Sequence, residues 1–462
     1  MNRREFLTYL SAISLLPLLS FQTEKLTYVF FNGKIYSDGR FLKGFVGINT
    51  MGKIVFSQNP LIGELNIDCK GLIIAPGFID ILADNASNPD KTYWIFEKYK
   101  LTDGCTTPLQ MHGGSDECGI FYKNFALKPH YTNYGVSTMV MTIRNKYPSL
   151  AVRLKKVEQN LDEGALGVSH SIEYQPTEYS ELLAYAKLAA KYQRTFFLHL
   201  RYSAKETELE GIKEAIQIAK DSGAAVHIDH IHSTGGTYNM PKALDLIKEA
   251  RKSGLKITAC VYPFSYWATY LPSKRFDPGW QQRYNLTYSD LTVVGTGETL
   301  TKEKFELYRK GYNRLVAVPE GTMNMKNTVD LALKEDFVMI GSDGGIESEP
   351  RANNHPRGAS CYATALSYAK KIQMPIEKML FKMIDLPKTL VQKPLENRGK
   401  IQNNYWADLV IFNPDTIQGK ATVANPNQFS QGIEYVFVNG KLAYEKGQLK
   451  NKAGAAIKYP SK

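Results

Sequence analysis

Three polar residues close apolar stretches that we expect to be β-strands, and their side-chain types suit chemistry at a metal ion. His199, His230 and Asp343 each stand at the carboxyl end of such a stretch. Neutral imidazoles ligate a borderline metal such as Zn²⁺, which lowers the pKa of its bound water to about 7. A carboxylate within hydrogen-bond distance can then act as general base and acid. A lone strand histidine is more often packed or hydrogen-bonded than a ligand, but two on consecutive strands, followed by Asp343, favour a metal site.

These residues need a scaffold that brings the ends of several strands together. The middle of the chain alternates short apolar stretches with amphipathic ones, which predicts an α/β fold with a (β/α)8 TIM barrel. Active sites of this fold lie at the carboxyl ends of the strands. An aromatic-rich insertion from Ser265 to about Met325 precedes the last strand and is expected to build or cover the site. The eight predicted strands are Ile73–Leu82, Cys105–Met111, Thr138–Ile143, Leu166–Ser169, Thr195–His199, Ala225–His230, Ile257–Tyr262 and Phe337–Asp343.

Strand patterns also mark both ends of the chain. Residues 26–36 predict two strands joined at an Asn-Gly turn, and residues 435–442 repeat that pattern. We therefore expect a small β-sandwich domain built from residues 23–74 and 402–456, around a barrel of residues 75–401. Among the predicted barrel strands the second is the weakest, because Pro108 removes a ladder donor.

Composition excludes several classes of protein. The formal net charge of the 462 residues is +12, but Lys and Arg are scattered, with no dense basic block. This predicts no nucleic-acid partner and a surface that favours small anionic substrates. The five cysteines are an odd number at scattered spacings, which indicates neither a disulfide framework nor a zinc ribbon.

Residues 1–22 resemble a targeting segment. Asn2-Arg3-Arg4-Glu5-Phe6-Leu7 is similar to a bacterial twin-arginine signal, and the apolar run that follows is short for a membrane span. We expect export to the periplasm. No clean cleavage site follows, so an uncleaved membrane anchor is one alternative, and a cytoplasmic protein with an apolar start is another.

The run Ala75-Pro76-Gly77-Phe78-Ile79-Asp80 resembles the start of the first barrel strand in the amidohydrolase superfamily. In that superfamily an x-His-x-His pair follows and holds a catalytic metal, whereas this chain has Leu82 and Asp84. The resemblance implies that His199 and His230 bind metal. It also implies that Asp343 takes a proton from metal-bound water and passes it to the leaving nitrogen.

Further segments resemble the D-aminoacylase (N-acyl-D-amino-acid deacylase) branch, over nearly the whole chain after the signal. The resemblance implies that Arg357 and Tyr174 hold the α-carboxylate of the substrate, as a planar bidentate donor and a hydroxyl. Arg357 could instead be a surface salt-bridge partner, and Tyr174 a packed aromatic at the barrel rim. His232 replaces a lysine of the branch, which implies a weaker or pH-dependent carboxylate contact, or another substrate. The matching segments are 103–107, 163–169, 172–176, 261–264, 355–358 and 432–436.

The branch also uses a cysteine ligand after the second strand, where this chain has Met111-His112-Gly113-Gly114. We hypothesise that His112 replaces that cysteine, so that one Zn²⁺ is held by His112, His199 and His230. The alternative is that His112 is an ordinary loop histidine. Leu82 cannot ligate a second metal, and Asp84 could do so only weakly.

The sequence thus favours an exported zinc-dependent hydrolase that cleaves the amide of a small N-acyl amino acid, with the D configuration as one candidate. The alternative is a degenerate barrel that binds a ligand without hydrolysing it. Leu82 and Gly113 favour this alternative, while the joint retention of His199, His230 and Asp343 argues against it. The sequence leaves the oligomeric state open.

Overall fold

The computed structural model describes residues 25–84, 89–311, 314–346 and 354–461. The predicted signal at residues 1–22 lies outside this part. Among the helices that are described, none combines the length and the apolar character needed to cross a membrane.

Eight parallel strands form the central sheet, and each pairs with its neighbours in chain order. Their residues are almost all buried, as expected of a parallel sheet that is covered on its outer face by helices. The predicted (β/α)8 barrel is therefore confirmed. The strands are β8 (Phe78–Asp80), β9 (Cys105–Ser115), β10 (Gly135–Met139), β11 (Gly167–Ser171), β12 (Thr195–His199), β13 (Ala225–Ile228), β14 (Ile257–Val261) and β19 (Val338–Ile340).

Side chains join the first and last strands of this sheet. The Ser342 backbone N–H, just after β19, donates to Asp80 Oδ1 of β8 at 3.1 Å, and the Ser342 hydroxyl donates to the Leu82 carbonyl at 3.2 Å. Lys100 Nζ lies 2.9 Å from Asp80 Oδ2, and both side chains are buried. Lys100 Nζ also donates to the Ser342 hydroxyl oxygen at 2.7 Å, so these buried side chains link β8 to the residue after β19 where the backbone ladder stops.

Helices cover the outside of the barrel because each presents an apolar stripe to the sheet. In α7, for example, Ile212, Ala215 and Ala219 are buried, and Gly223 ends the helix in the left-handed region at φ 72°. The helices are α2 (Pro89–Thr102), α3 (Cys118–Phe125), α4 (Val140–Lys146), α5 (Leu150–Asp162), α6 (Tyr179–Lys191), α7 (Glu208–Ser222), α8 (Met240–Lys252), α11 (Val329–Ala332), α12 (Arg357–Lys371), α13 (Ile376–Met383) and α14 (Asp385–Val391), with short 3-10 turns η3 (Met325–Asn327) and η4 (Lys393–Leu395).

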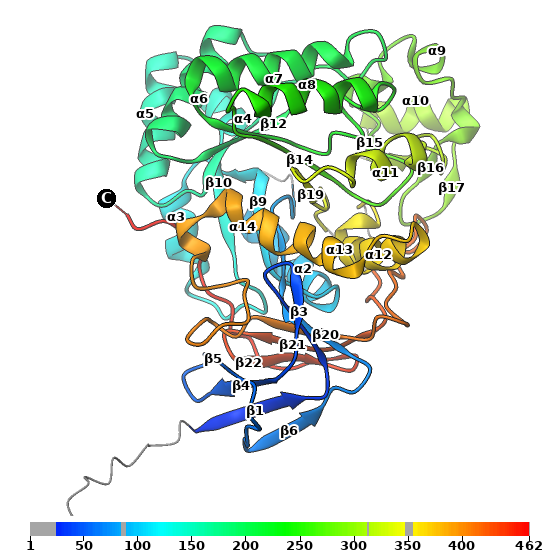
Figure 1. Cartoon of the computed structure of the whole chain (residues 1–462). Helices are drawn as coiled ribbons and strands as arrows, with labels where there is room; N and C mark the ends of the chain where they lie inside the picture. Colours follow the sequence, from blue (N-terminus) through cyan, green and yellow to red (C-terminus); the bar gives the residue numbers. More distant parts are fainter. Residues whose placement is uncertain (1–24, 85–88, 312–313, 347–353, 462) are drawn as a thin grey trace, which may run out of the picture.

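Two sheets built from both chain ends form the small β-domain below the barrel, where the blue and red strands of Figure 1 lie together. One sheet has the order β5-β4-β1-β6 and the other β23-β22-β21-β20-β7-β2-β3. The strands are β1 (Leu26–Phe31), β2 (Lys34–Ser37), β3 (Arg40–Leu42), β4 (Phe45–Asn49), β5 (Ile54–Ser57), β6 (Leu65–Asp68), β7 (Ile73–Pro76), β20 (Leu409–Phe412), β21 (Ile433–Val438), β22 (Lys441–Glu445) and β23 (Gln448–Leu449).

The first predicted barrel strand, Ile73–Leu82, is wrong as one element. Its first half is β7, which pairs with β2 and β20 in the β-domain, and only β8 enters the barrel. The chain changes sheets at Gly77, where an added Cβ would lie 2.1 Å from the Thr106 side chain. Only glycine permits this close approach.

Two other strand predictions need correction. The second strand, predicted to be weak, is the longest of the barrel with 11 residues. Pro108 is tolerated because it faces Asp80, the last residue of the short strand β8. The third strand ends at Met139, and the apolar residues after it continue as α4 rather than to Ile143.

The insertion between β14 and β19 forms a sheet of its own, with the order β15-β18-β16-β17. Several of its residues, Trp267 and Arg275 among them, line the cavity at the barrel mouth, as the sequence predicts for a long insertion. Its elements are β15 (Ala268–Tyr270), η1 (Lys274–Phe276), α9 (Trp280–Tyr284), η2 (Tyr288–Asp290), β16 (Thr292–Val293), β17 (Glu298–Thr299), α10 (Lys302–Gly311) and β18 (Leu315–Ala317).

Candidate metal centre and active site

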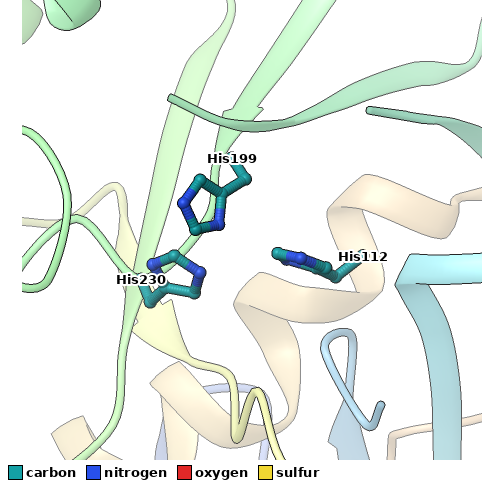
Figure 2. A group of neighbouring side chains, drawn as sticks. All are labelled: His112, His199 and His230. Atoms are coloured by element: carbon teal, nitrogen blue, oxygen red, sulfur yellow. The ribbon is translucent and has the colours of Figure 1, made fainter. Parts of the chain in front are cut away.

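Three buried histidines converge inside the barrel mouth. One nitrogen each from His112, His199 and His230 lies within 4.8 Å of the others, and Figure 2 shows the three rings facing a common space. Their ring centroids are 4.6 to 5.5 Å apart. The structure thus brings together the three residues that the sequence predicts as metal ligands.

Each histidine comes from a different strand or from the residues just after it. His112 lies within β9, His199 is the last residue of β12, and His230 follows β13 by two residues. The backbone of His230 is in the left-handed region at φ 28°, which is uncommon for a residue with a Cβ. The conformation turns the chain sharply after β13, and the His230 N–H is satisfied by the sulfur of Cys260 at 3.2 Å.

Glu173, after β11, holds the ring of His199. Its Oε2 lies 2.8 Å from His199 Nε2, and its Oε1 accepts from the Ser203 hydroxyl at 2.5 Å. Arg275, from the insertion, places a guanidinium nitrogen 3.3 Å from the same Oε2. His199 Nδ1 is buried and has no hydrogen-bond partner among the described residues. This nitrogen is therefore available to a metal, because Glu173 occupies the other one.

The other two histidines are held in the same manner. Asp229 Oδ2 lies 2.9 Å from Nδ1 of His112. The hydroxyls of Ser233 and Thr234 lie 2.8 and 3.0 Å from Nδ1 of His230. The contacts of His230 are hydrogen bonds, whereas Asp229 approaches His112 Nδ1 as a close charge contact without hydrogen-bond geometry. In both rings a contact at Nδ1 leaves Nε2 for the centre of the cluster. Such outer partners are what fixes the tautomer and orientation of metal-binding histidines.

The electrostatics of the cluster suit neutral imidazoles at two positions. Burial lowers the pKa of His199 and, strongly, that of His230. Burial also acts to lower the pKa of His112, but the close carboxylate of Asp229 outweighs it, and the pKa is raised. Burial disfavours the charged imidazolium, and the neutral ring is the form that ligates a metal.

Asp343 faces this cluster from the end of β19. Its Oδ2 lies 2.7 Å from a guanidinium nitrogen of Arg357 and 3.6 Å from His230 Nε2. Burial acts to raise the pKa of Asp343, but the charge of Arg357 outweighs it and holds the pKa well below its usual range. Asp343 Oδ1 is buried without a hydrogen-bond partner in the described part of the chain. A carboxylate fixed through one oxygen thus keeps the other for a proton.

These residues border a cavity of about 370 Å³ that opens at the barrel mouth. The cavity is lined by Asp84, His112, Met139, Met141, Ser171, Tyr174, His199, His230, Ser233, Tyr262, Trp267, Ala268, Thr269, Tyr270, Ser273, Arg275, Leu315, Asp343, Gly344, Gly345, Asn354, His355 and Arg357. Its size suits a small molecule.

The predicted substrate-binding residues differ in position. Tyr174 is partly exposed, lines the cavity and has its ring centroid 4.9 Å from that of His199. Arg357 also lines the cavity, but its Nε donates to the Asp343 carbonyl at 2.7 Å and it lies over the ring of Tyr262. His232 is fully buried and is not among the lining residues, and burial lowers its pKa to about 3. A neutral, buried His232 therefore brings no positive charge to the cavity wall.

The positions of the missing histidine pair do not join the cluster. Leu82 is fully buried in the apolar core of the barrel. Asp84 lines the cavity, where its Oδ2 accepts from Gln110 at 2.9 Å, and an added Cβ on Gly345 would meet its Oδ1 at 1.8 Å. Within the described ranges, the group of potential metal ligands contains histidines alone.

Three functional side chains escaped prediction from sequence. In the sequence, Glu173 falls within a segment that resembles the D-aminoacylase branch, Asp229 within the predicted sixth strand, and Arg275 within the aromatic-rich insertion. None of the three was predicted to act at the site. The available signal was charge: all three are ionisable residues next to predicted strand ends or inside an insertion expected to cover the site. Their partners could not be deduced without the fold.

Comparison with known proteins finds deacylases of N-acyl-D-amino acids among the relatives. No model of a known protein family matches the chain. It is 27% identical over 313 residues to an N-acyl-D-glutamate deacylase from Alcaligenes xylosoxydans xylosoxydans, covering 64% of this chain and 62% of that protein, just under two thirds. A D-aminoacylase from the same organism is 24% identical, covering 82% of this chain and 86% of that protein.

Solved structures show the same fold. The crystal structure of an N-acyl-D-glutamate deacylase from Bordetella bronchiseptica, complexed with zinc and a phosphonate inhibitor, superposes with a TM-score of 0.79. It is 21% identical and covers 94% of this chain and 100% of that one. A D-hydantoinase superposes with a TM-score of 0.62 at 14% identity, covering 94% and 98%. These structures share the fold of this chain, while the sequence relatives agree with the predicted enzyme class, an amidohydrolase that acts on carbon–nitrogen bonds other than peptide bonds.

Proposed function

We propose that this chain, which belongs to the D-aminoacylase branch of the amidohydrolase superfamily, is a zinc-dependent hydrolase of small N-acyl amino acids, with the D configuration preferred. The observation that carries the proposal is the convergence of His112, His199 and His230 beside Asp343 in one cavity. The names of the relatives, deacylases of N-acyl-D-amino acids, support the substrate class.

The residues present fit a divalent metal. His199 Nδ1 is buried and has no hydrogen-bond partner among the described residues, and one ring nitrogen from each of the three histidines lies within 4.8 Å of the others. We infer that the three histidines hold one ion, since Leu82 cannot ligate a second. When bound, the ion would polarise the amide carbonyl and lower the pKa of water.

The chain's own groups then have defined tasks. Asp343 Oδ1 accepts the proton of the attacking water and returns it to the leaving nitrogen, while Arg357 holds Oδ2. Arg357 and Tyr174, both at the cavity wall, orient the substrate carboxylate. The apolar walls around Trp267 and Met139 restrict access of bulk water.

The test is metal content by mass spectrometry on protein purified without chelators, followed by turnover of N-acyl-D- and N-acyl-L-amino acids. We expect about one zinc per chain, lost in a His199→Ala/His230→Ala variant and kept in His227→Gln, a buried histidine outside the cluster. Absence of metal even after zinc is supplied would contradict the proposal. Zinc binding without turnover would favour the alternative of a binding protein.

We also propose that residues 1–22 direct export to the periplasm. The support is the twin-arginine-like pattern followed by a short apolar run. Cell fractionation of the full chain and of an Arg3→Lys/Arg4→Lys variant is the test. The variant should stay in the cytoplasm, and unchanged export would contradict the proposal.

A further inference from the structure

The pair of Asp229 and His112 crosses the barrel mouth. Asp229 follows β13, His112 lies in β9, and three other strands separate these two in the sheet. Asp229 is 1% exposed and His112 is 7% exposed. The fold therefore brings two buried polar side chains from opposite sides of the barrel into contact at the site.

Asp229 has one partner in this position. Its Oδ2 lies 2.9 Å from His112 Nδ1, a charge contact at hydrogen-bond distance but without hydrogen-bond geometry, and its Oδ1 is buried without a hydrogen-bond partner among the described residues. A buried carboxylate is costly unless it is paired. Asp229 could have been replaced by an apolar residue if it served only to fill space at the barrel top.

The contact decides which nitrogen of His112 faces the cluster. An ionised carboxylate accepts and cannot donate, so Asp229 favours the ring state in which Nδ1 carries a hydrogen and Nε2 faces the cluster. Without Asp229 the ring of His112 could rotate or take the other tautomer. In addition, three neutral imidazoles bring no negative charge to a dication, and Asp229 brings one through the ring of His112.

We propose that Asp229 is the positioning residue that makes His112 a zinc ligand, an inference that rests on the metal centre proposed above. Asp229 does not touch the metal or the substrate. It acts through His112 alone, by fixing the ring and its tautomer and by adding negative charge behind it.

The decisive experiment is a double-mutant cycle in zinc affinity, measured by competition with a chelator. We expect Asp229→Asn and Asp229→Ala each to weaken zinc binding, by ~10–100-fold for the alanine variant. His112→Ala should weaken it at least as much, and adding Asp229→Ala to His112→Ala should cause no further loss. Equal losses from Asp229→Ala in both backgrounds, or no loss in either, would overturn the inference.

A matched control separates affinity from folding. Asp385→Asn changes a half-buried carboxylate, on α14 and hydrogen-bonded to the Tyr36 hydroxyl at 2.5 Å, far from the histidines in sequence and element. It should leave the zinc affinity unchanged whatever it does to the melting temperature. If Asp229→Ala lowers only the melting temperature, as this control does, Asp229 is a structural residue and the inference fails.

A second measurement needs no metal. Nitrogen-15 NMR of metal-free protein, recorded at a pH where the His112 ring is neutral, should find its hydrogen on Nδ1, and Asp229→Ala should shift that population toward the other tautomer. A His112 ring that carries its hydrogen on Nε2 in the unmodified protein would overturn the inference. This readout is independent of zinc. If the chain binds no zinc at all, the proposed function fails, but NMR still shows whether Asp229 sets the tautomer of His112.

Discussion

Glu173 connects three side chains of the site through one carboxylate. It contacts His199 Nε2 at 2.8 Å, accepts from Ser203, and faces the Arg275 guanidinium at 3.3 Å. Arg275 is 6% exposed, so Glu173 is the counter-charge that makes its burial tolerable. The charge of Arg275 in turn outweighs the burial of Glu173 and holds the pKa of that carboxyl well below its usual range.

We expect Glu173→Gln to destabilise the metal-free protein by about 3–5 kcal/mol, because it leaves Arg275 buried without its counter-charge. The double variant Glu173→Gln/Arg275→Met should recover most of the loss, since it removes both charges. Urea-induced unfolding in the presence of a chelator measures both. A double variant as unstable as Glu173→Gln alone would show that the ion pair is not the cause.

Residues at strand ends could be predicted from sequence, and residues that act through contacts could not. His199, His230 and Asp343 stand at the ends of apolar stretches, and a parallel barrel gathers such ends at one mouth. Glu173 and Arg275 are 102 residues apart, and nothing in either local sequence indicates the other. His112 could be proposed only as a replacement for a ligand of the branch, and its partner Asp229 is visible only in the fold.

At the scale of elements, α12 carries Arg357 at its first turn and is broken at Ser360, whose φ/ψ is not helical. The helix resumes with its N–H groups pointing at Asp103. Tyr362 N–H and Ala363 N–H donate to the two oxygens of Asp103 at 2.7 and 3.0 Å. Asp103 therefore caps a helix start in the interior and fixes the turn that presents Arg357 to Asp343.

Asp103→Ala should lower the unfolding free energy by about 1–3 kcal/mol, because two buried N–H groups lose their acceptor. Ser430→Ala removes only the hydroxyl that donates to Asp103 at 2.7 Å and should cost about 1 kcal/mol. Thermal melts of both variants provide the comparison. A Ser430→Ala variant as unstable as Asp103→Ala would mean that the helix cap contributes nothing.

The elements also show where sequence patterns mislead. Periodicity alone cannot distinguish one long buried strand from two short ones that enter different sheets, as in β7 and β8. Gly77 is the local sign of the change, because its backbone passes against Thr106 without room for a side chain. The strand β10 and helix α4 form a similar case, where an apolar run continues through a change of element.

At the scale of the whole molecule, the architecture was predictable because both of its parts repeat a simple pattern. Alternating apolar and amphipathic segments specify the barrel, and strand patterns at both ends specify a domain that must be completed late in the chain. The joint between the two parts was not predictable. It includes a buried cluster in which Asp408 accepts from Asn133 at 3.1 Å and from the Asn439 N–H at 2.8 Å, and pairs with Arg398.

Buried histidines outside the metal cluster make the stability of the whole barrel depend on pH. Burial lowers the pKa of His170 and of His227 to about 3. In the unfolded chain these groups titrate near 6.5. Both are therefore neutral in the folded protein, and their contribution to stability is complete above about pH 6.5 and is lost progressively as the pH falls toward 3.

His227→Gln tests this linkage because His227 is fully buried, pairs with Thr258 at 2.8 Å and is not one of the three clustered histidines. Between about pH 5.5 and pH 3.5 each such histidine adds about 1.4 kcal/mol of lost stability per pH unit. In unfolding curves recorded with a chelator, the stability of the His227→Gln variant should therefore fall less steeply with acid than that of the unmodified protein, by about that amount. If the stability of the two proteins falls with acid at the same slope, His227 is protonated in the folded state as it is in the unfolded one. The acid sensitivity of the barrel would then have to come from its carboxylates. Asp343 and Glu173 are the first candidates, because their ion pairs lower their pKa values.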